Sequence, residues 1–264
     1  MGEAIELHGL SFRYAEGSPW VVRDLDLAIR PGEFFVLLGP SGCGKTSVLN
    51  LIAGFERPTR GEVRVSGQPV AGPGADRAVI FQGDDSLYPW LTAAQNVEFP
   101  LKIRGMSRRE RQGLVAEHLR LVGLVGHEGK YPHQLSGGMR QRVQIARALV
   151  VPETRILLMD EPFVSVDAQT RAVLQGELSD IWMRSRKAVL FITHDISEAV
   201  ALGDRVGVMT SGPGASIREI VGVSLDRPRR RSTPRFGELY EHIWGLISGT
   251  VAADAGMGRG STHA

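Results

Sequence analysis

Short hydrophobic runs, each bounded by turn-forming or polar residues, recur along the chain. They occupy residues 34–38, 78–81, 156–159, 188–193 and 205–209. Unbroken apolar runs of this length are typical of strands buried on both faces, as in parallel sheets. A helical pattern over 45–53 follows the first run and ends at Gly54, the residue type favoured just after a helix. The alternation of runs and helical patterns predicts an α/β fold.

Two parts of the chain depart from this pattern. Residues 5–14 and 62–65 alternate or form turn-flanked strands, which predicts an antiparallel β flank. Between about 92 and 150 no strand is evident, and 107–121 has the apolar spacing of an amphipathic helix, which predicts a helical subdomain.

The C-terminal part is different again. An arginine cluster over 227–235 precedes a helical pattern over 236–247, and the Gly/Ala/Ser-rich residues 251–264 are expected to form a mobile tail. The predicted parts are therefore a core with its β flank over 1–91 and 156–225, a helical subdomain over 92–155, and a C-terminal extension over 226–264.

Composition narrows the class of protein. The 264 residues include 31 Lys and Arg against 29 Asp and Glu, and the formal charge of +2 is too small to steer a nucleic acid. The longest apolar runs have five residues, against the roughly 18 that a membrane helix needs. The first residues lack the basic and apolar regions of a signal peptide, and the single cysteine forms no internal disulfide. We expect a cytosolic protein that does not bind nucleic acid.

A glycine-rich loop follows the first buried run and precedes the first predicted helix. It matches the pattern G-x-x-x-x-G-K-[ST] in the strand–loop–helix context that such a match requires. Glycines let backbone amides converge on phosphate, Lys45 reaches the β- and γ-phosphates, and Thr46 offers a hydroxyl to Mg²⁺. The residues assigned to nucleotide binding are Gly39, Pro40, Ser41, Gly42, Cys43, Gly44, Lys45 and Thr46. The alternative is a plain glycine-rich turn.

A second candidate phosphate site lies at 135–139, which reads LSGGM. Ser136 can cap a helix whose first amides, exposed by Gly137 and Gly138, can meet phosphate. A second anion site is redundant for one nucleotide held within one chain. The run resembles the signature of ATP-binding-cassette (ABC) ATPases, which implies that the signature of one subunit closes on the γ-phosphate bound by a second copy. The alternative is merely a capped helix with an amphipathic face.

Two adjacent carboxylates, Asp160 and Glu161, follow the apolar run from residue 156. Neighbours on a strand point in opposite directions, so one carboxylate can face a metal and the other can face water. The resemblance implies that Asp160 holds Mg²⁺ and that Glu161 acts on the attacking water. The alternative is an acidic strand end near solvent. Residues 163–167 resemble the family's D-loop, which implies a nucleotide-site role for Asp167.

Three further residues take their roles from the resemblance. His194, after the run 188–193, resembles the switch histidine that contacts the γ-phosphate. Gln82, after the run 78–81, resembles the Q-loop glutamine that links Mg²⁺ and water to the helical subdomain. Tyr14 stands where the family stacks an aromatic ring on adenine, although a strand face shared with Phe12 would also suit a core role.

The motifs keep the family's order over roughly residues 5–247. The resemblance implies a RecA-like P-loop NTPase core that binds ATP and Mg²⁺, hydrolyses ATP as a homodimer, and joins two transmembrane permease subunits at the cytoplasmic face of the inner membrane. Segments 72–77, 87–92 and 135–139 resemble the import ATPases for nitrate, sulfonates and taurine. In such importers a periplasmic binding protein delivers an oxyanion. Met139 replaces the commoner Gln of the signature, and Gln95 stands where an acidic residue is usual.

Other functions remain open. An importer of an unrelated small molecule would carry the same motifs, because substrate choice belongs to other subunits. A soluble, non-transport member of the family usually carries two cassettes or a coiled-coil insert, and no heptad run is present here. A regulator without turnover would be expected to lack Glu161 or His194.

An apolar, aromatic cluster follows the Q-loop. It consists of Leu87, Tyr88, Pro89, Trp90 and Leu91. In the resembling importers this neighbourhood receives a short cytoplasmic helix of the permease, and Trp and Tyr are favoured anchors at such contacts. We predict a docking site here. The alternative is that these residues pack the joint between the subdomains.

Overall fold

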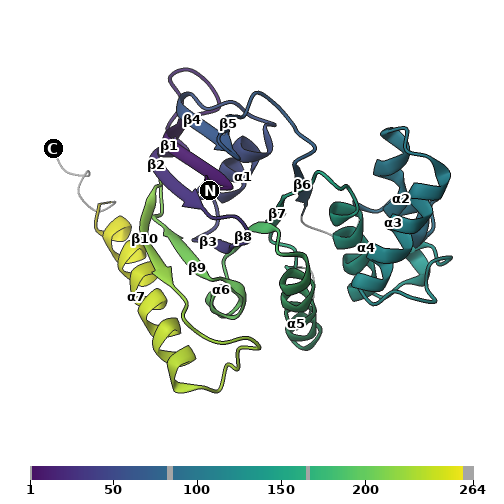
Figure 1. Cartoon of the computed structure of the whole chain (residues 1–264). Coiled ribbons are helices and arrows are strands. Elements are labelled where there is room, and N and C mark those ends of the chain that lie inside the picture. Colours follow the sequence, from purple (N-terminus) through teal and green to yellow (C-terminus); the bar gives the residue numbers. More distant parts are fainter. Residues whose placement is uncertain (1, 82–85, 165–166, 258–264) are drawn as a thin grey trace. The chain divides into compact units, whose positions relative to one another are not determined.

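The computed structural model describes residues 2–81, 86–164 and 167–257. Contacts divide the chain into two compact units, residues 1–74 with 188–264 and residues 75–187. Parallel strands alternate with helices along the chain, which confirms the predicted α/β class (Figure 1). The predicted part boundaries near residues 91, 155 and 225 stay predictions.

The first unit contains a sheet centred on the strand that leads into the glycine-rich loop. This strand, β3, lies parallel to both β8 and β9, and β10 pairs antiparallel with β9. Every residue of β3 and β8 is buried, as their unbroken apolar runs predicted. The elements are β3 (Phe34–Leu38), α1 (Lys45–Ala53), β8 (Ala188–Thr193), α6 (Ile196–Leu202), β9 (Arg205–Met209) and β10 (Ile217–Gly222).

An antiparallel sheet forms the predicted flank in the same unit. Strand β1 pairs with β2 on one side and with β4 on the other, and the short β5 pairs with β4. The strands are β1 (Ile5–Phe12), β2 (Val22–Ile29), β4 (Arg60–Val65) and β5 (Gln68–Pro69). Their inward faces supply buried aliphatic side chains such as Leu7, Leu10, Leu25 and Val63.

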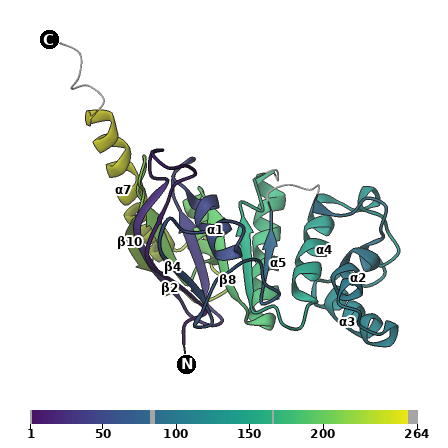
Figure 2. The same cartoon turned by 90° about the horizontal axis from the view of Figure 1, so that it is seen from above.

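The helix α7 (Pro234–Met257) ends the described chain and corrects the predicted tail. It begins two residues before the predicted helical pattern and continues through residues 251–257, while 258–264 lie outside the described residues. The reason is that alanine, frequent in this stretch, has the highest helix propensity. Figures 1 and 2 both show α7 beside β10. Buried Phe236, Leu239 and Ile243 fix the helix there, at about 1.5–3 kcal/mol for each large side chain.

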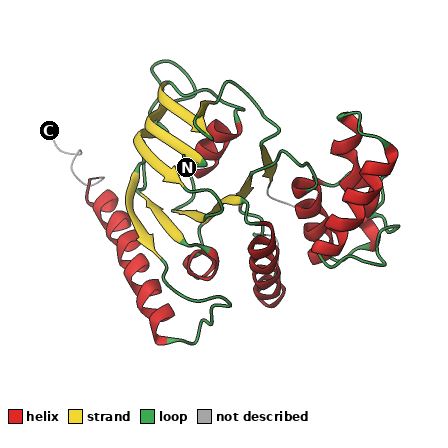
Figure 3. Ribbon diagram, viewed as in Figure 1, coloured by secondary structure: helices red, strands yellow, loops and turns green. Residues whose placement is uncertain are grey.

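The second unit is mostly helical, as Figure 3 shows. Strands β6 (Arg77–Ile80) and β7 (Ile156–Asp160) form a parallel pair, and Ile80 lies opposite Met159. The described residues between 92 and 150 hold helices and no strand, as predicted. Capping boxes begin two of these helices, with Thr92 and Ser107 as the N-cap residues. The helices are α2 (Ala93–Ile103), α3 (Arg108–Leu121), η2 (Pro132–Gln134), α4 (Gly137–Leu149) and α5 (Ala168–Ser185).

The length and apolar content of a helix decide whether it can cross a bilayer. Over the ranges that the structure describes, no helix combines the length and the apolar content needed to cross a bilayer, and this includes the 24-residue α7.

Candidate functional site

The glycine-rich loop joins β3 to α1, so its backbone is fixed at both ends. Gly44 is the N-cap of α1 and adopts a left-handed conformation with φ 94°. A Cβ at this position would lie 2.9 Å from Cγ1 of both Val21 and Val22. Because an L side chain avoids this φ and would also clash, the loop requires glycine at residue 44.

Lys45 lies inside the loop rather than in solvent. Its side chain is buried, and Nζ donates hydrogen bonds to the carbonyl oxygens of Gly39 and Pro40, both at 2.8 Å. Within the described chain, no side chain caps α1 and its first turn holds no acidic residue. The helix N-terminus therefore combines backbone amides and partial positive charge with a fixed ammonium group, which is the chemistry that binds phosphate.

Two other loop residues have distinct settings. Cys43 is buried, with Sγ 3.9 Å from Sδ of Met209, so its side chain packs against β9. Thr46 is exposed in the first turn of α1, where its hydroxyl is accessible to a ligand. The loop thus has one face closed by packing and one face open to solvent.

Tyr14 lies close to this loop, beyond the end of β1. Its hydroxyl is 3.0 Å from Oγ of Ser47 in α1, and its ring meets that of Phe12 edge-on at 5.0 Å between centroids. The expectation that Phe12 and Tyr14 share a strand face is wrong, because β1 ends at Phe12 and Tyr14 lies outside the strand. Phe12 is buried, whereas Tyr14 is 68% exposed, so Tyr14 is available for stacking and is not a core residue.

His194 leaves the sheet at the same edge as the glycine-rich loop. Leu38 and Thr193 are paired in register on the parallel strands β3 and β8, so Gly39 and His194 both follow directly from paired residues. His194 is exposed between the end of β8 and Asp195, the N-cap of α6. The first unit therefore brings together the phosphate loop, Tyr14 and His194.

The acidic pair lies in the second unit. Asp160 is the last residue of β7 and is buried, whereas Glu161 lies outside the strand with φ 43°. The predicted strand alternation therefore does not reach Glu161, and a left-handed backbone sets its direction instead. Such a conformation is strained for a residue other than glycine, and strain of this kind is concentrated at functional sites.

The signature motif also lies in the second unit. Ser136 is the N-cap of α4, and its Oγ accepts a hydrogen bond from the backbone N–H of Met139 at 3.2 Å. Gly138 is buried, and a Cβ there would lie 3.0 Å from Cδ2 of Leu174. Ser136 is exposed, so the start of α4 presents amides to solvent while glycine allows close packing behind it.

Asp167 is an N-cap residue as well. Its carboxylate accepts hydrogen bonds from the backbone N–H groups of Thr170 at 3.0 Å and Gln169 at 3.1 Å, at the start of α5. These bonds, the Thr170 amide first, hold the pKa of the Asp167 carboxyl below its usual value. The D-loop residues 165–166 and the Q-loop residue Gln82 lie outside the described residues.

A hollow of about 690 Å³ lies in the second unit beside the predicted docking cluster. Tyr88 lines it and contacts the ring of Phe99 at 4.5 Å between centroids. Within the cluster, Leu87 is buried and Trp90 is 70% exposed, so Leu87 is a core residue and Trp90 is not. The other lining residues include Phe81, Pro100, Ile103, Arg77 and Arg104.

Arg147 on α4 is a lining residue that the motifs did not indicate. Its guanidinium lies 5.7 Å from the Tyr88 ring centre and donates a hydrogen bond to the Ser86 carbonyl at 2.7 Å. Burial lowers its pKa. The only sequence signal is a basic residue on the half-buried face of a helix, which is too common to single it out.

Known proteins of the ABC transporter family are similar to this chain in sequence. A model of the ABC transporter family matches residues 22–164. The chain is 46% identical to the nitrate import ATP-binding protein NrtD of Synechococcus elongatus, over 88% of this chain and 86% of that protein. It is 45% identical to the taurine import ATP-binding protein TauB of Sinorhizobium fredii, over 89% and 90%.

A solved structure is similar over most of the chain. It is the dimeric post-hydrolysis state of the ATP-binding cassette MJ0796 bound to ADP and Pi. It superposes with a TM-score of 0.68 at 30% identity and covers 84% of this chain and the whole of that chain.

Proposed function

Because the chain belongs to the ABC transporter family, has its P-loop ATPase fold and couples ATP hydrolysis to transport, we propose that it serves an importer of a small oxyanion such as nitrate, taurine or another sulfonate. The similarity to nitrate and taurine import proteins along most of the chain is the observation that supports this proposal. Nitrate is a small anion, and taurine is a small molecule that carries an anionic sulfonate group.

The site residues divide into phosphate binding and hydrolysis. Lys45, with the loop amides from Gly39 to Thr46, binds the β- and γ-phosphates, and Tyr14 stacks on adenine. Glu161 orients and polarises the attacking water, His194 contacts the γ-phosphate, and Gln82 links Mg²⁺ and the water to the helical subdomain. The buried ammonium of Lys45 and the exposed ring of Tyr14 support these roles.

A magnesium ion fits the oxygen donors that the chain offers. Mg²⁺ is usually held by one or two carboxylates together with substrate phosphates and water. The described residues contain no cluster of three or more His, Cys, Asp or Glu side chains suited to a metal, whereas Asp160 offers a carboxylate and Thr46 a hydroxyl. Asp160, Thr46 and Gln82 are the proposed ligands, and the ion would neutralise charge on the phosphates.

A second copy of the chain completes the proposed assembly. The start of α4, with Ser136, Gly137 and Gly138, and the N-cap residue Asp167 present the surface that meets nucleotide held by the partner. The dimeric form of the similar MJ0796 cassette supports this arrangement. The dimer binds two permease subunits, which would keep the chain at the cytoplasmic face of the membrane, and a periplasmic binding protein supplies the oxyanion.

Reconstitution tests the importer proposal. The chain, its cognate permease and its binding protein are placed in liposomes with internal ATP. Uptake of labelled nitrate, taurine and bicarbonate, and of a labelled sugar and amino acid for comparison, is measured beside ATP hydrolysis. We expect one oxyanion to accumulate and to stimulate hydrolysis, and Glu161→Gln to abolish both. Accumulation of a sugar or amino acid instead would favour an unrelated substrate, and hydrolysis without uptake of any solute would refute the importer.

A further inference from the structure

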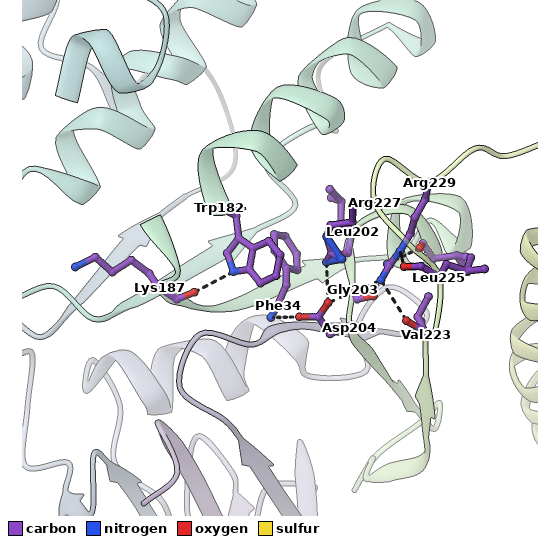
Figure 4. Close-up of polar contacts among 11 residues, drawn as sticks. Phe34, Trp182, Lys187, Leu202, Gly203, Asp204, Val223, Leu225, Arg227 and Arg229 are labelled. Carbon is purple, nitrogen blue, oxygen red and sulfur yellow. Dashed lines mark hydrogen bonds and ion pairs between the residues drawn. The ribbon is translucent and has the colours of Figure 1, made fainter. Parts of the chain in front are cut away.

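Two arginines of the C-terminal extension are buried against α6 in the first unit. The side chain of Arg229 is 2% exposed and that of Arg227 is 9% exposed. Figure 4 shows both guanidinium groups directed at Leu202, Gly203 and Asp204, the residues that lead from the end of α6 to the start of β9. Buried cations are rare unless they are paired and fully hydrogen-bonded, so their placement here requires a reason.

The arginines bind the backbone carbonyls at the C-terminal end of α6. Arg229 donates to the carbonyl of Val200 at 2.9 Å and also to that of Gly203. Arg227 donates to the carbonyl of Leu202. The last carbonyls of a helix have no intrahelical partner and carry partial negative charge, so cationic donors satisfy and stabilise them.

The same arginines tie this helix end to the C-terminal extension. Arg229 also donates to the carbonyls of Val223 at 3.2 Å and Leu225 at 3.1 Å in its own segment. Only a planar guanidinium group, with its five N–H donors, reaches the carbonyls of α6 and those of the extension at once. Arginine differs from lysine here in this respect. Burial, and then the nearby charge of Arg227, lower the pKa of Arg229 to about 10. Arg229 is therefore still charged at neutral pH.

Asp204 extends the connection to the strand of the phosphate loop. Its carboxylate lies 3.0 Å from the guanidinium of Arg227 and accepts a hydrogen bond from the Phe34 N–H at 3.0 Å. Phe34 begins β3, which leads to the glycine-rich loop. The arginine pair thus contacts the C-terminal end of α6 directly and, through Asp204, the first residue of the strand that leads to the phosphate loop.

His194 directly precedes the opposite end of α6. There Asp195 caps the helix through the N–H groups of Ser197 and Glu198, and Thr193 donates to the Glu198 carboxylate at 2.7 Å. The helix has seven residues and is therefore about 10 Å long. A helix this short is marginal in isolation, so its position depends on tertiary contacts. Its buried face packs against β3 and α7, and the arginines hold its C-terminal end.

We propose that Arg229, together with Arg227, is a positioning residue for His194, because it fixes the C-terminal end of the short helix that the histidine precedes. The effect on turnover rests on the proposed role of His194 at the γ-phosphate. The effect on the histidine's position does not. A purely structural role would instead stabilise the extension and leave the surroundings of His194 unchanged.

The first test follows the histidine itself in the full-length chain. Arg229→Met keeps a long apolar side chain and removes the donors, and Arg230→Met is the matched control, because Arg230 is the exposed neighbour. NMR of the histidine rings identifies His194 by the signal lost in His194→Gln. We expect this signal to shift or broaden in Arg229→Met and to stay in place in Arg230→Met. An unchanged signal in folded Arg229→Met would overturn the proposal.

The second test is a double-mutant cycle on ATP turnover. Arg229→Met should lower kcat at least about tenfold with little change in KM, since small misplacements of a catalytic group are costly. The same change made in a His194→Ala background should cost less than about twofold, because coupled residues are not additive. Equal losses in both backgrounds would show that Arg229 acts elsewhere and overturn the proposal.

Two outcomes separate this inference from the proposed function. If His194→Ala leaves turnover intact, the assigned role of His194 fails, while the NMR result still decides whether Arg229 positions it. If His194→Ala sharply lowers turnover but Arg229→Met behaves as wild type in both measurements, the positioning role fails and the proposed function stands. Should Arg229→Met not fold, Arg227→Met removes fewer bonds and is expected to give a smaller change in the same His194 signal.

Discussion

The buried ammonium of Lys45 is the residue-scale feature on which nucleotide binding depends most directly. Lys45→Ala should weaken ATP binding at least about tenfold, because a charge-assisted hydrogen bond contributes about 1.5–3 kcal/mol. Lys102→Ala is the matched control, since Lys102 forms a half-exposed ion pair with Glu98 on α2. Titration with a fluorescent ATP analogue measures both variants. Equal affinities for the two would remove Lys45 from the phosphate site.

Glu161 differs from Lys45 because it is proposed to act on water and not on binding. Glu161→Gln preserves the shape of the side chain and removes its charge, so ATP binding should persist while turnover falls by about 10²–10⁴-fold. Glu153→Gln is a suitable control, because Glu153 is an exposed carboxylate that precedes the same strand. Turnover within tenfold of wild type in Glu161→Gln would count against the assignment.

The motifs predict which residues are site candidates but not the backbone conformation of each one. Residue types and spacing predicted Lys45, Asp160 and Ser136 as site candidates, because phosphate and metal chemistry restrict which side chains can serve. The left-handed backbone of Glu161 and the position of Tyr14 beyond β1 could not be predicted in this way. Both depend on where a strand ends, which the hydrophobic pattern locates only to within a residue or two.

At the scale of elements, buried strands were the most predictable part of the fold. The runs at Phe34–Leu38, Ala188–Thr193 and Arg205–Met209 coincide with β3, β8 and β9, since strands covered on both faces need continuous apolar sequence. Strand β2 was not predicted, although its burial nearly alternates. Its charged residues weaken the local signal, and its pairing with β1 is a long-range property.

The C-terminal extension was the least predictable element. The sequence shows an arginine cluster but assigns it no role, whereas the structure buries Arg227 and Arg229 against carbonyl acceptors that include residues of α6. No local pattern reports such partners. The residues of the candidate site are therefore more predictable from sequence than the residues that pack around them. Phosphate and metal chemistry restricts the type of residue at each position, whereas packing restricts only the total volume of the side chains.

Ser136, at the N-terminus of α4, is predicted to face the nucleotide of a second copy of the chain. Ser136→Arg should leave ATP binding to the monomer nearly intact and abolish the ATP-dependent dimer, because a bulky side chain would block the partner's γ-phosphate. Ser107→Arg makes the same change at the N-cap of α3, outside the signature, and should preserve the dimer. The cost of losing a cap, about 1 kcal/mol, is common to both variants.

Gel filtration in a Glu161→Gln background, with and without ATP, measures this dimer. Retention of the dimer in Ser136→Arg would refute closure of the signature on the partner's nucleotide. Loss of the dimer in both variants would instead assign the effect to helix capping.

At the scale of the whole molecule, the proposed transport requires contact with a permease. The exposed Trp90 and the hollow lined by Tyr88 are the described features that best suit such a contact. Soluble monomers rarely expose large apolar patches without a partner, and aromatic side chains dominate the energy of protein interfaces. The exposure of Trp90 argues against the alternative that it packs a joint within the chain.

Replacement of Tyr88 and Trp90 by Ala should weaken association with the permease by about 2 kcal/mol or more, roughly 30-fold in affinity. ATP affinity should not change, because the phosphate loop lies in a different part of the chain. The single variant Trp90→Ala should leave the melting temperature nearly unchanged, whereas Tyr88→Ala should lower it slightly through the lost contact with Phe99. Trp244→Ala is the matched control, since Trp244 is a half-exposed tryptophan on α7. Normal permease binding in the double variant, or equal weakening by Trp244→Ala, would show that the docking surface lies elsewhere.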